Sequence, residues 1–74
     1  MLVIVGQVWI NKKTRRKVVV TNVVVVLNVL DKVDDRMSKV HYENLGEPDP
    51  GKRYMRKYGR RYLDTFLRDF RLVA

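Results

Sequence analysis

Two short stretches of the chain concentrate basic side chains, and the second also carries aromatic rings. The first cluster consists of Lys12, Lys13, Arg15, Arg16 and Lys17. The second consists of Lys52, Arg53, Arg56, Lys57, Arg60 and Arg61, interleaved with Tyr54, Tyr58 and Tyr62. Cationic side chains that neutralise phosphates release condensed counterions, and exposed tyrosine rings can stack on the bases of a single strand. We therefore predict a nucleic-acid-binding surface formed by both clusters together with Tyr54 and Tyr58.

The tyrosines of the second cluster also have a purely structural interpretation. Tyr54, Tyr58 and Tyr62 are spaced four apart, so they would share one stripe of a helix or one face of a strand. Either arrangement could pack on a core, and the sequence leaves open whether the rings face core or solvent. Nothing in the clusters specifies base readout, so we expect binding driven by charge and shape, to either RNA or DNA.

The sequence offers little for catalysis. It has one His (His41), one Ser (Ser38) and no Cys, whereas acid–base and nucleophilic catalysis need an activated group with a partner beside it. His41 and Glu43 could pair on one face of a strand, but two solvated polar residues are the simpler interpretation. Three acids could bind a cation weakly but are expected to cap a helix or aid solubility instead: Asp31, Asp34 and Asp35. We predict no enzyme activity, no metal, no cofactor and no small-molecule substrate.

Composition limits the class of protein. The 74 residues are expected to form a single domain, 1–74, with a net charge of +8, which favours anionic partners. The charge is clustered, because residues 1–30 carry five positive charges and no acid, while residues 31–51 are net negative.

The valine run 18–30 is too short for a bilayer span and contains polar residues. We therefore expect no membrane segment and a cytoplasmic setting.

The elements that would position these side chains are mostly strands. Fourteen Val in so short a chain favour β structure. Leu63, Phe66, Leu67 and Phe70 show helical spacing, and Trp9 is expected in the core with its N–H on a backbone carbonyl. Residues 12–17 are expected at a hairpin tip, and Gly6 at a bend. Strands are predicted at residues 2–10, 18–30, 38–45, 52–62 and 70–73, with a helix or 3₁₀ turn near 63–69 and a loop at 46–51. Residues 18–30 could be one long strand or two strands with a tight turn near Thr21 and Asn22.

Several segments resemble a group of small bacteriophage and actinobacterial proteins that are mostly uncharacterised. The similar segments are "VGQVW", "KVVVTNV", "VHYENL", "GRRY" and "LDTFLRDFRLV". The resemblance covers most of the chain and implies a small SH3-like antiparallel β-barrel. Residues 25–38 and 46–59 look longer than the family pattern, and residues 25–38 could form an ordered extension or a mobile loop.

We predict a phage-type protein that binds nucleic acid without sequence specificity, in the host cytoplasm if it is phage-encoded. The alternative is a protein-interaction module, either a virion accessory subunit or a phage factor that binds a host protein. It would use the exposed valine-rich strand edge, through which homo-oligomerisation would fit equally well. Basic clusters on one face would favour nucleic acid, whereas clusters on opposite faces beside a bare apolar edge would favour the interaction module.

Overall fold

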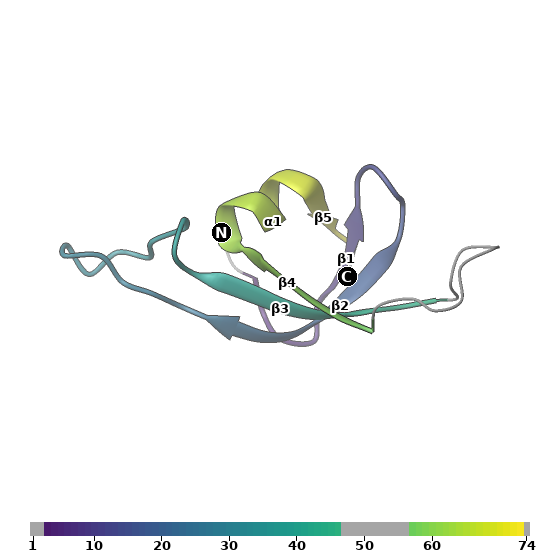
Figure 1. The fold of residues 1–74 in the computed structure, drawn as a ribbon, viewed down its shortest axis with the longest axis horizontal. Coiled ribbons are helices and arrows are strands. Elements are labelled where there is room, and N and C mark those ends of the chain that lie inside the picture. Colours follow the sequence, from purple (N-terminus) through teal and green to yellow (C-terminus); the bar gives the residue numbers. More distant parts are fainter. Residues whose placement is uncertain (1–2, 47–56, 74) are drawn as a thin grey trace.

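The computed structural model describes residues 3–46 and 57–73, which form one five-stranded antiparallel sheet and one short helix (Figure 1). The strand order across the sheet is β4-β3-β2-β1-β5. The elements are β1 (Val8–Asn11), β2 (Lys17–Val24), β3 (Lys39–Asn44), β4 (Tyr58–Tyr62), α1 (Leu63–Asp69) and β5 (Phe70–Leu72). The expectation of a mainly β fold with one short helical turn near the C-terminus is confirmed.

The sheet does not close into the barrel that we expected. β4 and β5 lie at its two edges, and within the described residues no ladder joins them. The reason lies in the chain path, because α1 begins directly after β4 and β5 begins directly after α1. The helix lies over the concave side of the sheet between these two edge strands (Figure 1). Kinship with SH3-like proteins stays a prediction.

Two strands are shorter than the sequence indicated. β1 begins at Val8 rather than at residue 2, because the chain turns at Gly6, whose φ of 92° suits glycine. This agrees with the bend expected at Gly6. β2 ends at Val24 rather than at residue 30. For the predicted strand 52–62, residues 52–56 lie outside the described residues, and β4 occupies its second half.

A β-bulge explains how the valine run divides between core and solvent. The register between β2 and β3 shifts between Val20 and Asn22, so Thr21 is an extra residue in β2. Before the bulge Val18 and Val20 face the core, and after it Val23 packs against the core while Asn22 is exposed. Without the shift, strict alternation would turn Asn22 inward. The valine-rich strand β2 therefore contains two segments whose alternation between core and solvent differs in phase.

Aromatic rings dominate the core between the sheet and α1. Phe66 is fully buried, and its ring centroid lies 5.1 Å from that of Trp9 and 4.6 Å from that of Phe70. The remaining buried apolar residues are Val18, Val20, Val40, Tyr42 and Leu63. Trp9 is buried as predicted, but its N–H donates to the side-chain oxygen Oε1 of Gln7 at 3.3 Å rather than to a backbone carbonyl. Gln7 is close enough because it precedes β1 in the turn that Gly6 makes.

The helix α1 matches the predicted range, 63–69. Leu63 and Phe66 are buried and Leu67 is partly buried, as the helical spacing indicated. Its first N–H groups find acceptors outside the helix, since the Leu63 N–H donates to the Ser38 carbonyl and the Asp64 N–H to the Asp35 carbonyl. These two bonds fix α1 against the chain segment that enters β3.

Residues 25–37 form an ordered projecting hairpin, here called the arm (Figure 1). A bridge joins Leu27 and Val33, and Asn28 Oδ1 accepts the N–H groups of Leu30 and Lys32 across the tip. At the base, the buried Ser38 hydroxyl accepts the Val26 N–H at 2.9 Å. The arm does not continue β2 as a strand, because β2 ends at Val24 and an isolated bridge joins the two sides of the arm. The arm contributes to an elongated shape, with principal extents of 48 × 22 × 20 Å.

Candidate nucleic-acid interface

The strand β4 presents different residues to the two sides of the sheet. Tyr58, Arg60 and Tyr62 alternate with Gly59 and Arg61, as the period of a strand requires. The first three side chains are exposed, and the other two positions are half-buried against the core. Four members of the predicted site, Lys52, Arg53, Tyr54 and Arg56, lie outside the described residues. The described part of the second cluster is therefore divided between both faces of the sheet.

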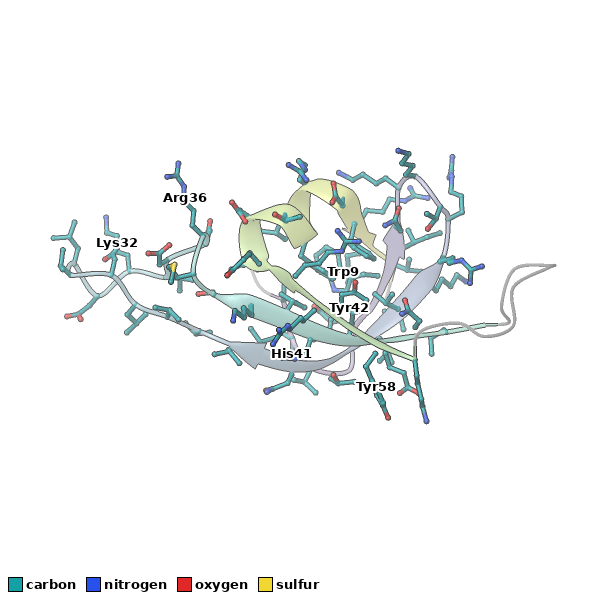
Figure 2. All side chains as sticks on the ribbon, in the orientation of Figure 1. Trp9, Lys32, Arg36, His41, Tyr42 and Tyr58 are labelled. Carbon is teal, nitrogen blue, oxygen red and sulfur yellow. The ribbon has the colours of Figure 1, made fainter. Side chains whose placement is uncertain are left out.

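Tyr58 and Tyr62 face solvent, which decides the alternative that the sequence left open for these two rings. Their exposed fractions are 57% and 46%. Figure 2 shows Tyr58 on the side of the sheet opposite to Trp9 and Tyr42. Four residues of strand separate the two tyrosines by about 13 Å, so each ring would take a different base rather than both sandwiching one. Arg60 lies between them on the same face.

The neighbouring strand β3 completes this surface, which we call the outer face. The β3–β4 register places Lys39 opposite Tyr62, His41 opposite Arg60 and Glu43 opposite Tyr58. The outer face consists of Lys39, His41, Glu43, Lys57, Tyr58, Arg60 and Tyr62. The Lys39 ammonium lies 5.5 Å from the Tyr62 ring centroid, and the Lys57 ammonium lies 5.4 Å from that of Tyr58. Each exposed ring thus has a cation beside it.

Lys39 was absent from the candidate site predicted from the sequence, although the residue pattern around Lys39 indicated that its side chain faces solvent. The alternation of Val40 and Tyr42 with Lys39, His41 and Glu43 already indicated a strand with one solvent-facing side. What the sequence lacked was the pairing of that side with β4. His41 and Glu43 share one face of β3, as expected. Each is paired across the sheet with a residue of β4.

The Arg61 side chain lies on the inner side of the sheet, where it contacts residues of three other elements. Its Nε donates to the Tyr42 hydroxyl at 3.2 Å, and its Nη1 lies 3.5 Å from Asp69 Oδ2. Its guanidinium also lies 5.7 Å from the centroid of the Phe70 ring. These contacts connect β4 and β3 with the end of α1 and the start of β5, across the open side of the sheet. Arg61 was predicted to bind phosphate, but these contacts give it a structural role.

The first basic cluster lies at the β1–β2 hairpin loop, as predicted. Asn11 Oδ1 accepts the N–H groups of Lys13 and Thr14, and Arg15 adopts a left-handed φ of 64° to complete the turn. Lys12 is less available than the others, because its ammonium donates to the Arg68 carbonyl at 3.1 Å. The exposed members of the cluster are Lys12, Lys13, Arg15 and Lys17, and Arg16 is half-buried.

A groove of about 390 Å³ separates this loop from the C-terminal end of α1. We call it the inner groove, and its lining residues are Asn11, Lys12, Lys13, Thr14, Arg61, Arg68 and Asp69. Asp69 is paired with Arg68 at 3.0 Å and with Arg61. The hydrogen bond from Arg68 and the charges of Arg68, Arg61 and Lys12 lower the pKa of Asp69 below its ordinary value. The inner groove is basic, but part of its charge is already neutralised within the fold.

Asp34 holds the charged turn at the base of the arm, but it does not cap a helix as the sequence suggested, because residues 34–37 form a turn that leads into β3. Asp34 Oδ1 accepts the N–H of Arg36 at 3.0 Å and that of Met37 at 3.2 Å. The carboxylate therefore satisfies backbone donors at the base of the arm.

Comparison of the chain with protein-family models, with curated proteins and with solved structures finds no match. Within the described ranges, no helix has the length and apolar character needed to cross a membrane.

Proposed function

We propose that this protein binds single-stranded nucleic acid, without sequence preference, through the outer face. One observation carries the proposal: Tyr58 and Tyr62 are solvent-exposed on the same side of β4 as Arg60, with a lysine beside each ring. Bases would stack on the two rings while Arg60, Lys39 and Lys57 neutralise the phosphates between them. Stacking on rings and contacts to phosphates carry no sequence information, so binding of this kind tolerates any sequence.

The first basic cluster, at the β1–β2 hairpin loop, supports the same function through long-range electrostatic attraction. The hairpin loop brings exposed basic side chains together, and the chain carries a net charge of +8. A field of this sign attracts a polyanion and raises its association rate, with an effect that falls as salt increases. A phage-encoded protein acting in the host cytoplasm is the setting implied by the sequence resemblance, and we retain it as part of the proposal.

The test is binding of short single-stranded and double-stranded DNA and RNA, measured by fluorescence anisotropy at low and physiological salt. Tyr58→Leu is compared with Tyr58→Phe, which keeps the aromatic ring. Loss of one stacked base costs about 1–3 kcal/mol, or roughly five- to 150-fold in Kd. We expect this loss for the leucine variant and near-normal affinity for the phenylalanine variant.

Arg60→Ala is compared with Arg71→Ala, which removes the same charge from an exposed position on β5. Arg60→Ala should weaken binding and reduce the slope of log K against log salt by about 0.7, the value of one phosphate contact to a single strand. Arg71→Ala should change both quantities much less. Equal effects of the two arginine variants, or equal binding by Tyr58→Leu and the wild type, would show that only the overall charge attracts the polyanion.

A further inference from the structure

The arm concentrates the exposed apolar side chains of this protein. Of the fifteen large exposed hydrophobic residues in the part of the chain that the structure describes, seven lie within residues 25–37: Val25, Val26, Leu27, Val29, Leu30, Val33 and Met37. At the tip, Val29 is 99% exposed and Leu30 is 71% exposed. Single exposed apolar residues are ordinary in monomers, but a contiguous group of this kind marks an interaction surface.

The conformation of the arm is held by hydrogen bonds within a single copy of the chain. Its tip is fixed by the two hydrogen bonds to Asn28 Oδ1, and its base by the bonds between Val26 and Ser38 and by the Asp34 cap. A surface that is already ordered loses less conformational entropy when it is covered. The exposure of Val29 and Leu30 is thus a property of a defined hairpin.

The charge of the arm differs from that of the remaining chain. The arm carries three acids and two bases, a net charge of −1, whereas the whole chain has a net charge of +8. A nucleic acid gains nothing from contact with the arm, because its acids repel phosphates. The net charge of the chain opposes close approach of a second copy, whereas the net charge of the arm is small and both signs are present there.

We propose that the arm is a self-association surface that pairs with the arm of a second copy about a two-fold axis. The apolar side chains of the two arms pack together. The bases Lys32 and Arg36 of each copy then face the acids Asp31 and Asp35 of the other. A surface that carries both signs beside an apolar centre is self-complementary, which is what an isologous dimer contact requires. The arm projects from the sheet on the side away from the hairpin loop (Figure 1).

The first experiment measures molar mass by sedimentation velocity across a wide range of protein concentration. Val29→Asp/Leu30→Asp places two charges at the tip, where the native side chains make little contact with the fold. Ile4→Asp/Val5→Asp is the matched control, because both residues are about half exposed in the N-terminal turn. We expect a concentration-dependent dimer for the wild type and the control, and a monomer for the tip variant. A wild type that stays monomeric, or a control that dissociates as readily as the tip variant, would overturn the proposal.

A second experiment tests the pairing of charges between copies. Lys32→Glu/Arg36→Glu makes the arm acidic, and Asp31→Asn/Asp35→Lys makes it basic while keeping a residue tolerated at the left-handed φ of 56° at position 31. Asp34 stays unchanged because it caps the turn. Each variant alone should be a weaker dimer than the wild type, and an equimolar mixture should form the heterodimer. Failure of the mixture to associate more tightly than either variant alone would contradict the two-fold pairing. Binding of nucleic acid plays no part in either readout, so this proposal and that of the outer face can fail separately.

Discussion

Arg60 and Arg61 are adjacent and carry the same charge, yet β4 turns them to opposite sides of the sheet. Arg60 is exposed between two tyrosines, whereas Arg61 contacts Tyr42, Asp69 and Phe70. A variant that replaced both would confuse a loss of binding with a loss of stability. Comparison of Arg60→Ala with an exposed arginine elsewhere avoids this problem, which is why Arg71 serves as its control.

Asp69 makes the stability of the open side of the sheet depend on pH. Its pKa is lower in the folded chain than in the unfolded chain, chiefly because of the hydrogen bond from Arg68. Its ion pairs therefore stabilise the folded state above the unfolded-state pKa, and this stabilisation is lost as pH falls through the folded-state pKa. We expect wild type to lose more stability than Asp69→Asn when the pH is lowered from neutral into the acidic range.

Urea unfolding at a series of pH values measures this difference, and added salt should reduce it because the pairs are partly exposed. Asp64→Asn is the control, since Asp64 is an exposed carboxylate at the opposite end of the same helix, where it accepts the N–H of Thr65. Equal dependence on pH in the wild type and Asp69→Asn would contradict the assignment.

At the scale of the elements, the pairing of β3 with β4 depends on the absence of a side chain at Gly59. A Cβ built at this position would lie 2.6 Å from Cζ of Tyr42, whose ring covers the glycine. Tyr42 is held between the sheet and the rings of Phe66 and Phe70, so it has little room to move. Gly59→Ala should lower the free energy of unfolding by about 1–3 kcal/mol, the usual cost of overpacking.

Chemical denaturation of Gly59→Ala beside Arg60→Ala tests this expectation. The second variant changes the next residue of the same strand, but on the solvent side, and should stay within about 0.5 kcal/mol of the wild type. Similar stability of both variants and the wild type would show that Tyr42 can shift to admit the methyl group.

The elements differ in how far the sequence could predict them. Helix α1 was predictable because Leu63, Phe66 and Leu67 repeat with helical period and become its buried side. The sequence did not show which residues of β2 face the core. The bulge at Thr21 changes the phase of the alternation, and no glycine or proline marks its position. The different roles of Arg60 and Arg61 depend on the register of β4 beside β3, which is a non-local property. The open side of the sheet also depends on where α1 lies, and local spacing carries no information about that.

At the scale of the whole molecule, stability depends on a small core. Among residues 3–46 and 57–73, eight apolar residues are buried, and Phe66 contacts the rings of Trp9, Tyr42 and Phe70. Replacing a buried Phe by Ala costs about 3–5 kcal/mol. A domain of this size has a free energy of unfolding near the lower end of the range of about 5–15 kcal/mol. We therefore expect Phe66→Ala to be largely unfolded or to melt far below the wild type.

Circular dichroism during heating measures this effect. Leu67→Ala is the control, because Leu67 lies on the same helix and is only partly buried. It should melt between Phe66→Ala and the wild type. Equal melting temperatures for the two variants would indicate that the core is not centred on Phe66.

The burial of Trp9 also gives the protein a built-in optical reporter. It is the one tryptophan in the chain, it is buried beside Phe66, and its side of the sheet is opposite to that of Tyr58 (Figure 2). When the tryptophan is excited selectively, its emission spectrum therefore reports the integrity of the core. Unfolding can thus be followed by intrinsic fluorescence, without attaching a dye.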